Sequence, residues 1–295
     1  MKKIYVIPLI AAIIIAGAVI ALLYPSQRTR IKATTTTSLY ATGLLDYLAS
    51  EFSKREASVS FDFIPVGSGE ALRRAELGDA CMVFVHAPSL EKRYLEEGVI
   101  TDRRIFAYNY FIIVGPAGDP AGIRNAKSPL EAFSKIYQAG EAGEACFVSR
   151  GDNSGTHVKE LSIWRAAGLN PSGKPWYMET GSGMSTTLLV ANERNAYALS
   201  DIGTYLKLRS EGRLPNLQIL YQGDVDLINI YSVYLVSTCG DPERGLAIEF
   251  MDFVSGDGQD LIASYGVDKY GRPLFNPAKD DLSWLEEAWS RLAAS

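Results

Sequence analysis

The sequence predicts an α/β protein of two lobes joined by two long extended segments. Strand-like and helix-like patterns alternate along most of the chain, and two long apolar stretches, Ile105–Gly115 and Ile228–Val236, interrupt the alternation. The chain has 295 residues, and single hydrophobic cores stop growing at roughly 250–300 residues. We therefore expect the two stretches to be crossovers between two lobes that close on a ligand in the cleft between them.

Apolar periodicity gives each lobe its own set of elements. Residues recurring at spacings of three and four predict helices, and alternating or short continuous apolar runs predict strands. In the first lobe the patterns predict helices at Leu44–Phe52, Gly69–Leu77 and Ser89–Glu97. Between these helices they predict a strand at Ser60–Val66 and a buried strand at Cys81–Ala87. In the second lobe they predict one strand, Cys146–Ser149, and helices at Pro129–Gln138, Ser154–Ala167, Met184–Asn195 and Asp201–Arg209.

The C-terminal tail completes the first lobe. Its segment Glu243–Tyr265 has the pattern of one amphipathic helix. We expect the first lobe to comprise residues 33–112 together with residues 228–295, and the second lobe to comprise residues 113–227.

An uncharged apolar run, Ile4–Tyr24, follows two lysines at the N-terminus. At ~1.5 Å per helical residue it is long enough to cross a ~30 Å hydrocarbon layer. The lysines on its N-terminal side place the rest of the chain outside the cytoplasm. We expect residues 1–30 to be a retained membrane anchor with a short tether on the extracytoplasmic face. The alternative is a signal peptide cleaved near Ala16-Gly17-Ala18, which leaves a secreted or periplasmic protein.

Composition narrows the possible partners. The chain is 47% apolar and 21% charged, which is the balance of an ordinary globular protein. Its net charge is -5 and its basic residues are scattered among acids, so we expect no nucleic-acid partner. A small anion remains compatible with this charge, because a few aimed donors hold it. We expect a monomer.

The three cysteines, Cys81, Cys146 and Cys239, are far apart and form no Cys-x-x-Cys pair. This spacing indicates neither a zinc site nor a disulfide framework. We expect three small buried side chains, with one disulfide and one free thiol as the alternative. We expect no metal and no cofactor.

Hydroxyl groups stand at two points where a predicted strand meets a helix. The run Thr34-Thr35-Thr36-Thr37-Ser38 precedes the first helix, and Thr37 and Ser38 are nearest to it. In Val66-Gly67-Ser68-Gly69 the glycines permit close backbone approach, and Ser68 lies where unpaired helical N–H groups point outward. Both sequences could hold an anion, although strand ends, N-caps and turns account for either one in isolation.

A third junction, Ser149–His157, supplies a cation. Arg150 offers planar, permanently charged donors suited to an oxyanion. Ser154 and Thr156 add hydroxyls at a helix start, where the helix dipole and the backbone near Gly155 favour a negative group. Asp152 is placed to orient Arg150. A fourth, glycine-rich junction contains Gly183, which can approach a ligand through its backbone or serve as a simple turn.

The segment Gly151–Gly155 is also similar to the nucleophile region of serine proteases, but an enzyme needs a positioned base. The chain has two histidines. His86 ends a predicted buried strand, which favours a role in the core, and His157 lies in a first helical turn, where it can pack or cap. We therefore expect no enzyme, and a serine-type hydrolase is the weakest alternative.

Taken together and in this order, the junctions resemble those of the substrate-binding proteins of tungstate ABC transporters. The resemblance covers most of residues 33 to 237 and rests on Ala33–Ser38, Gly43–Asp46, Val66–Gly69, Ser149–His157, Glu179–Met184 and Ala198–Tyr205. It implies the type II periplasmic-binding-protein fold, and ligand contacts from Thr37, Ser38, Ser68, Arg150 and Thr156. It also implies delivery of the anion to a permease with its cytoplasmic ATPase. Ser185 departs from the glycine expected after Gly183-Met184.

Phosphate is the nearest rival ligand, because Arg-x-Asp-x-Ser-Gly-Thr is also similar to the signature of phosphate-binding proteins. Phosphate keeps a proton at neutral pH, so a selective site supplies a carboxylate acceptor. We expect Asp152 to be occupied by Arg150, and the first two junctions contain no spare carboxylate. The sequence therefore favours tungstate over phosphate, while molybdate, with the same shape and charge, is equally compatible.

Overall fold

The computed structural model describes residues 28–294. The predicted anchor, Ile4–Tyr24, lies outside the described residues. Among the residues that are described, no helix is long and apolar enough to cross a membrane.

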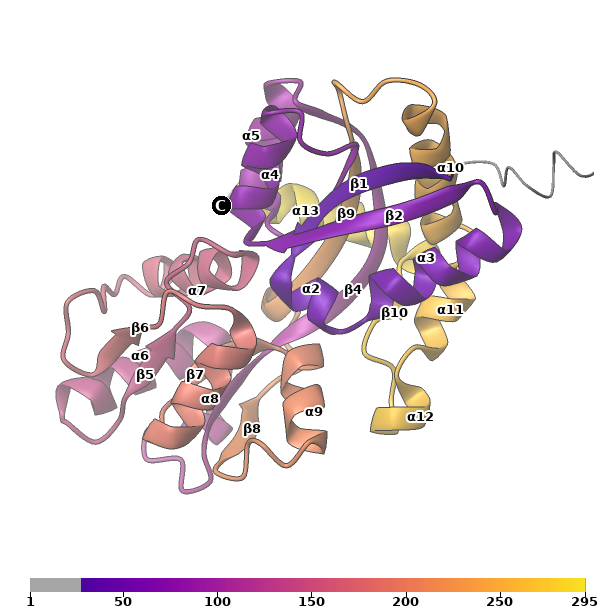
Figure 1. Cartoon of the computed structure of the whole chain (residues 1–295). Helices are drawn as coiled ribbons and strands as arrows, with labels where there is room; N and C mark the ends of the chain where they lie inside the picture. Colours follow the sequence, from indigo (N-terminus) through magenta and orange to yellow (C-terminus); the bar gives the residue numbers. More distant parts are fainter. Residues whose placement is uncertain (1–27, 295) are drawn as a thin grey trace, which may run out of the picture.

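The first lobe is built on a mixed sheet whose strands follow the order β10-β4-β9-β3-β1-β2 (Figure 1). The strand β1 (Thr29–Thr36) pairs in parallel with both β2 (Val59–Val66) and β3 (Met82–Val85). β9 (Ile228–Val236) runs antiparallel beside β3, and the short β10 (Asn276–Pro277) pairs with the edge of β4. The helices of this lobe are α2 (Thr37–Ala41), α3 (Leu44–Arg55), α4 (Ser68–Glu76), α5 (Pro88–Glu96), α10 (Glu243–Ser255), α11 (Gln259–Ser264), α12 (Val267–Tyr270) and α13 (Leu282–Ala293).

The second lobe surrounds the end of β4 (Ile100–Pro116). This end pairs antiparallel with β7 (Ala198–Asp201) and β8 (Leu217–Tyr221). A separate parallel pair consists of β5 (Phe147–Ser149) and β6 (Tyr177–Glu179). The helices are α6 (Pro129–Glu141), α7 (Gly155–Ala166), α8 (Met184–Arg194) and α9 (Ile202–Ser210), and short 3₁₀ turns lie at Ile123–Asn125, Val225–Leu227 and Lys279–Asp281.

The strand β4 runs through both lobes, and β9 leads from the second lobe back into the sheet of the first lobe. The first part of β4 pairs with β9 in the first lobe, and its last part pairs with β7 and β8 in the second. All nine residues of β9 are buried. Such continuous apolar strands suit positions that are covered on both faces.

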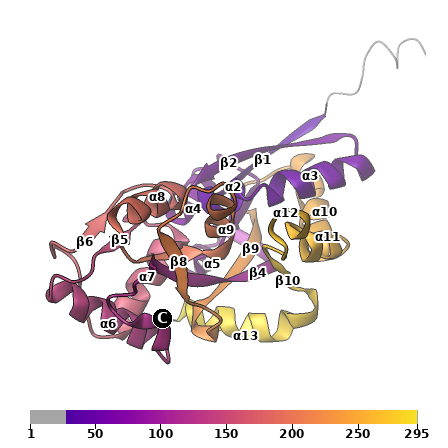
Figure 2. The same ribbon diagram turned by 90° about the horizontal axis from the view of Figure 1, so that it is seen from below.

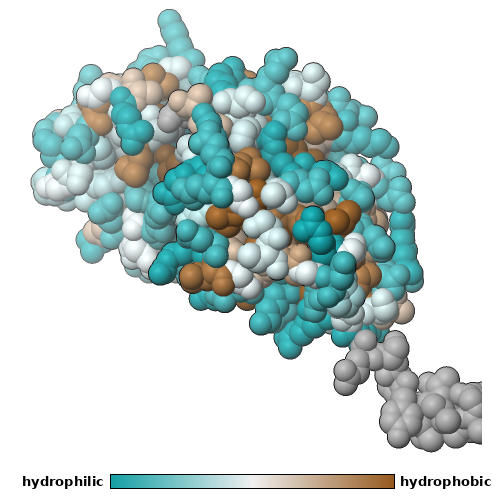
Figure 3. Space-filling model, turned by 90° about the horizontal axis from the view of Figure 1, so that it is seen from above, coloured by the Kyte–Doolittle hydropathy of each residue, from teal (hydrophilic) through white to brown (hydrophobic). Residues whose placement is uncertain are grey.

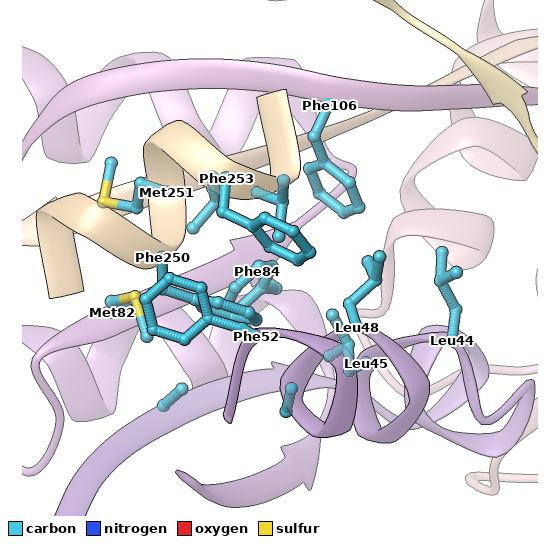
Figure 4. Close-up of a cluster of buried hydrophobic side chains, with 14 of the residues drawn as sticks. Leu44, Leu45, Leu48, Phe52, Met82, Phe84, Phe106, Phe250, Met251 and Phe253 are labelled. Carbon is cyan, nitrogen blue, oxygen red and sulfur yellow. The ribbon is translucent and has the colours of Figure 1, made fainter. Parts of the chain in front are cut away.

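Separate hydrophobic clusters hold the two lobes. In the first lobe, Phe52, Phe84 and Phe250 meet between α3, the sheet and α10 (Figure 4), with the rings of Phe52 and Phe250 5.3 Å apart. In the second lobe, Phe133 and Trp164 pack with ring centroids 4.5 Å apart. The face shown in Figure 3 is largely hydrophilic, with apolar residues interspersed among polar ones.

The C-terminal tail differs from the single helix expected. Gly256 and Gly258 separate α10 from α11, and a Cβ at Gly256 would lie 2.9 Å from the carbonyl oxygen of Asp252. α13, which the sequence did not predict, lies along β4 (Figure 2), and its buried Trp289 belongs to one hydrophobic cluster with Ile105 of β4 and Ile230 of β9. At the other end, β1 begins at Thr29, inside the segment expected to be a tether.

Two of the cysteines form a disulfide, so the expectation of three small buried side chains was wrong. Cys81 precedes β3 and Cys239 follows β9, and these antiparallel neighbours bring the two Cα atoms to 4.8 Å. That distance is within the range that a disulfide spans. Cys146 is free and exposed, so the alternative of one disulfide and one free thiol is the arrangement observed.

Candidate anion-binding site

The predicted strand-to-helix junctions meet between the two lobes. Thr37 and Ser38 open α2 and Ser68 opens α4, and these helices follow the parallel neighbours β1 and β2, whose carboxyl ends lie at one edge of the sheet. From the second lobe, the N–H of Gly155 donates a hydrogen bond of 3.1 Å to Ser68 Oγ. The junctions of the first and second lobes are thus in direct contact.

Arg150 is the charged centre of this region and is only 2% exposed. Its Nη2 donates to Asp152 Oδ2 at 2.5 Å and to Thr37 Oγ1 at 3.3 Å, and Asp152 Oδ1 accepts from the N–H of Ser154 at 3.2 Å. Asp152 therefore orients Arg150 as expected. Arg150 Nε and Nη1 are buried and have no hydrogen-bond partner among residues 28–294. Buried donors left unpaired are costly, so they favour an acceptor ligand.

The same junctions also contain buried hydroxyls. Ser38, Ser68 and Thr156 are all buried, and Thr156 Oγ1 has no hydrogen-bond partner in the described part of the chain. Ser154 behaves as an N-cap, because its Oγ accepts from the N–H of His157 at 3.3 Å. The ring Nδ1 of His157 accepts from the N–H of Asn153 at 3.0 Å, so this histidine is not aimed at Ser154 as a base.

A cavity of about 190 Å³ lies between Thr37 and Ser38 on one side and residues 183–186 with Thr204 on the other. Gly183 is the N-cap of α8, and a Cβ there would lie 3.7 Å from Thr37 Oγ1. The first-turn amides of α8 have no partner within their own helix, and the dipole makes this end favourable to anions. The fourth junction therefore lines the cavity with backbone donors.

Two residues in this region were missed or assigned another role from the sequence. His86 is buried, as the predicted core position requires, and its Nε2 also lies 3.3 Å from Ser38 Oγ. Asp201 caps α9 and accepts from both the N–H and the hydroxyl of Thr204, each at 2.8 Å. Burial raises the pKa of the Asp201 carboxyl, against those bonds and the nearby charge of Arg150. The sequence signal for this cap was available: Asp201 follows a short apolar segment and precedes Thr204 by three positions.

The arrangement is rich in donors, and its carboxylates are engaged. Asp152 accepts hydrogen bonds from Arg150 and Ser154, and Asp201 accepts hydrogen bonds from Thr204. The described residues contain no group of three or more His, Cys, Asp or Glu side chains suited to a metal ion. Such a set of donors can replace the hydration shell of a small, fully ionised anion.

Comparisons with known proteins identify the family of the chain. A Haloferax volcanii protein, described as a candidate ABC transporter anion-binding protein, is 41% identical over 251 residues, which cover 82% of this chain and 70% of that protein. The tungstate-binding protein TupA of Peptoclostridium acidaminophilum is 37% identical over 248 residues, which cover 82% and 84% of the two chains.

The solved structures give the same relationship. The tungstate ABC transporter structure from Geobacter sulfurreducens is 42% identical, with a TM-score of 0.71 over 80% of this chain and 98% of that chain. The model of a PBP superfamily domain matches residues 24–257. The chain therefore belongs to the PBP superfamily, within the family of the tungstate-binding proteins TupA.

Proposed function

We propose that this protein captures tungstate outside the cytoplasm and delivers it to an ABC importer. The observation that carries the proposal is Arg150, a buried guanidinium that reaches Thr37 of the other lobe and keeps two nitrogens unpaired within the described residues. The TupA relative named for tungstate binding is 37% identical to this chain and the tungstate ABC transporter structure is 42% identical, and both support the same ligand.

In this proposal the direct donors are Thr37, Ser38, Ser68, Arg150 and Thr156. Ser154 contributes by capping α7, Asp152 by orienting Arg150, and Gly155 and Gly183 by allowing the backbone to approach the anion. A dianion that leaves water requires every lost hydration contact to be replaced inside the protein, and these groups come from both lobes.

The engaged carboxylates favour tungstate over phosphate. Phosphate at neutral pH carries a proton and needs an acceptor, whereas Asp152 and Asp201 already accept hydrogen bonds within the protein. Molybdate has the same shape and charge as tungstate, and we expect it to bind as well. A hydrolase is disfavoured because His86, which lies next to Ser38, is neutral with a pKa of about 3 and is a poor general base.

Capture requires that the lobes close. We propose that residues 33–112 with 228–295 form one body and residues 113–227 the other, with β4 and β9 as the hinge. Cross-lobe bonds support a closed arrangement: Gly155 N–H to Ser68 Oγ at 3.1 Å, and Lys207 Nζ to the carbonyl oxygen of Ala41 at 2.8 Å. Reopening on a permease, powered by its cytoplasmic ATPase, would release the anion.

The disulfide supports an extracytoplasmic location, because such bonds persist in oxidising compartments. We propose that Ile4–Tyr24 anchors the chain to the membrane, with cleavage of this segment as the alternative. Its two preceding lysines and uninterrupted apolar character support the anchor.

The function is tested with the chain from Arg28 onward, by thermal unfolding and isothermal titration with tungstate, molybdate, phosphate and sulfate at equal concentration. A ligand that binds only the native state raises the melting temperature by mass action. We expect stabilisation by tungstate and molybdate and much less by the other two. Equal stabilisation by phosphate would overturn the tungstate assignment in favour of the phosphate alternative.

A further inference from the structure

His86 is held where the two lobes meet. It follows β3, is 3% exposed, and its ring lies 4.9 Å from that of Tyr231 on β9 and 6.2 Å from that of Phe111 on β4. A Cβ added to Gly155 would lie 2.5 Å from His86 Nδ1. The imidazole is therefore packed by both crossover strands and by the first turn of α7, which fixes its orientation.

The surroundings of the ring define its tautomer. Nε2 lies 3.3 Å from Ser38 Oγ, whereas Nδ1 is buried and has no hydrogen-bond partner within residues 28–294. The Asn229 side chain and the His86 backbone interact with the ring and raise its pKa, but no group lies at hydrogen-bond distance from Nδ1 within residues 28–294. A proton on Nδ1 would therefore be a buried donor without a bonded acceptor, which folded proteins rarely tolerate. The proton therefore belongs on Nε2, where it is donated to Ser38 Oγ.

This assignment decides what the Ser38 hydroxyl can do. Because its oxygen accepts from His86, its own proton is free for another acceptor. Thr36 Oγ1, 3.4 Å away, is a weak candidate, since it already accepts from the N–H of Leu39 at 3.2 Å. An ionised oxygen is a stronger acceptor than a hydroxyl, and Ser38 lines the cavity between the lobes.

We propose that His86 is a positioning residue of the anion site: its Nε2–H donates to Ser38 Oγ, and Ser38 donates its own proton to the bound oxyanion. The second step rests on the proposed function. Donors in such a chain polarise one another, so the Ser38 hydroxyl becomes a better donor than an isolated serine.

The surroundings of His86 keep its ring neutral, so the hydrogen bonds from His86 to Ser38 and from Ser38 to the anion, here called the relay, contain no charged imidazole. Burial, then the nearby charge of Arg150, lowers the pKa of His86 to about 3. From β9 the facing titratable group is Tyr231, whose pKa is raised well above its ordinary value by burial, so it is neutral as well. Arg150 thus remains the positive charge beside the ring, and His86 sets the direction of a hydrogen bond without adding a second cation.

The first step is tested by nuclear magnetic resonance of the full-length protein carrying ¹⁵N-labelled histidine, without ligand. The chain has two histidines, so the variant His157→Gln assigns the His86 signals. We expect a protonated Nε2 and an unprotonated Nδ1 that do not titrate between about pH 5 and 8, the range in which an ordinary histidine changes charge. A proton on Nδ1, or a titration in that range, would overturn the proposal whether or not tungstate binds.

The second step is tested by a double-mutant cycle with tungstate titration. His86→Met removes the donor with an unbranched side chain, and His86→Gln is its matched control because the amide can still donate. We expect His86→Met and Ser38→Ala each to weaken binding about tenfold, and His86→Gln to recover most of that loss. On the Ser38→Ala background, His86→Met should have no further effect.

The outcomes separate the possible explanations. A further loss from His86→Met on the Ser38→Ala background would show that His86 acts through packing, and would overturn the relay. Tungstate affinity of His86→Met equal to that of the parent protein would do the same. If the parent protein binds no tungstate, the proposed function and the second step of the relay fail together, while the resonance experiment still decides the first step.

Discussion

Arg150 Nη2 in the second lobe donates to Thr37 Oγ1 in the first lobe across 3.3 Å, while the same nitrogen donates to Asp152 at 2.5 Å. One nitrogen of the guanidinium thus links the two lobes and holds the planar group in one orientation. The other two nitrogens remain unpaired within the described residues.

Arg150→Ala should weaken tungstate binding by roughly two powers of ten or more, because hydrogen bonds to charged groups contribute about 1.5–3 kcal/mol each and ~1.4 kcal/mol is tenfold. Arg150→Lys should recover only part, since an ammonium lacks the planar fork. Thr156→Val should cost less than Arg150→Ala. Titration calorimetry measures all three, with Arg165→Ala, an exposed arginine on α7, as the control. Unchanged affinity in Arg150→Ala would falsify the site.

Gly155→Ala should weaken tungstate binding while leaving each lobe folded. The new Cβ would lie 2.5 Å from His86 Nδ1 and 2.8 Å from the His86 carbonyl oxygen, so the closed arrangement of the lobes has to shift. Gly118→Ala is the matched control, because a Cβ there meets nothing within 4 Å. Small-angle scattering and calorimetry should show a more open, weaker-binding variant. If Gly155→Ala behaves like Gly118→Ala, the close approach of His86 and Gly155 is not required for binding.

Glu160→Gln should flatten the dependence of stability on pH. Burial raises the pKa of the Glu160 carboxyl to about 7, even though Oε1 accepts from Tyr177 at 2.7 Å and from Trp164 at 3.1 Å. The native state therefore holds this proton more tightly than the unfolded chain, in which the pKa is near 4.5. Its contribution to stability is greatest below about pH 4.5 and is lost as pH rises toward 7.

A glutamine keeps an oxygen acceptor at that position, so the variant should fold. Urea unfolding across that pH range is the measurement, and Glu144→Gln, at an exposed residue, is the control. If the parent protein and Glu160→Gln lose the same stability between those pH values, Glu160 does not titrate as described.

Removing the disulfide with the double variant Cys81→Ser/Cys239→Ser should lower the free energy of unfolding by about 2–4 kcal/mol, because the bond constrains the unfolded chain. The two residues are 158 positions apart, so the closed loop is long. Thermal unfolding with and without a reductant is the measurement. The parent protein should be sensitive to the reductant and the double variant should not. Cys146→Ser, at the free and exposed cysteine, should retain the sensitivity of the parent.

Full-length protein should remain with membranes after high-salt and alkaline washing, because Ile4–Tyr24 is long and apolar enough to span a bilayer. Fractionation of cells followed by immunoblotting is the measurement, and the chain from Arg28 onward is the control that should stay in the wash. N-terminal sequencing that begins near Val19 would instead establish cleavage of the segment.

Much of the fold followed from local patterns. Apolar residues recurring with the period of a strand or of a helix predicted most elements of both lobes. The two long apolar stretches predicted β4 and β9, because a strand that is buried on both faces needs apolar residues along its whole length. The sequence did not predict the short strands β6, β7 and β8, since three to five residues carry little periodicity, although it did predict the equally short β5. The amphipathic pattern of the tail continued across Gly256 and Gly258, where the backbone ends α10.

By itself, the sequence determined which residues open the helices of the second lobe and which neighbour orients Arg150, because a cap or an Asp two positions away acts through adjacent backbone. Only the tertiary structure decided that Cys81 pairs with Cys239, that Asp201 is buried near Arg150, and that His86 reaches Ser38. Those relationships join residues far apart in the chain, and they form only after the strands have paired and the lobes have met. Local propensity carries no record of such long-range contacts, so the same histidine that fits a core position in the sequence becomes part of the candidate anion site in the fold.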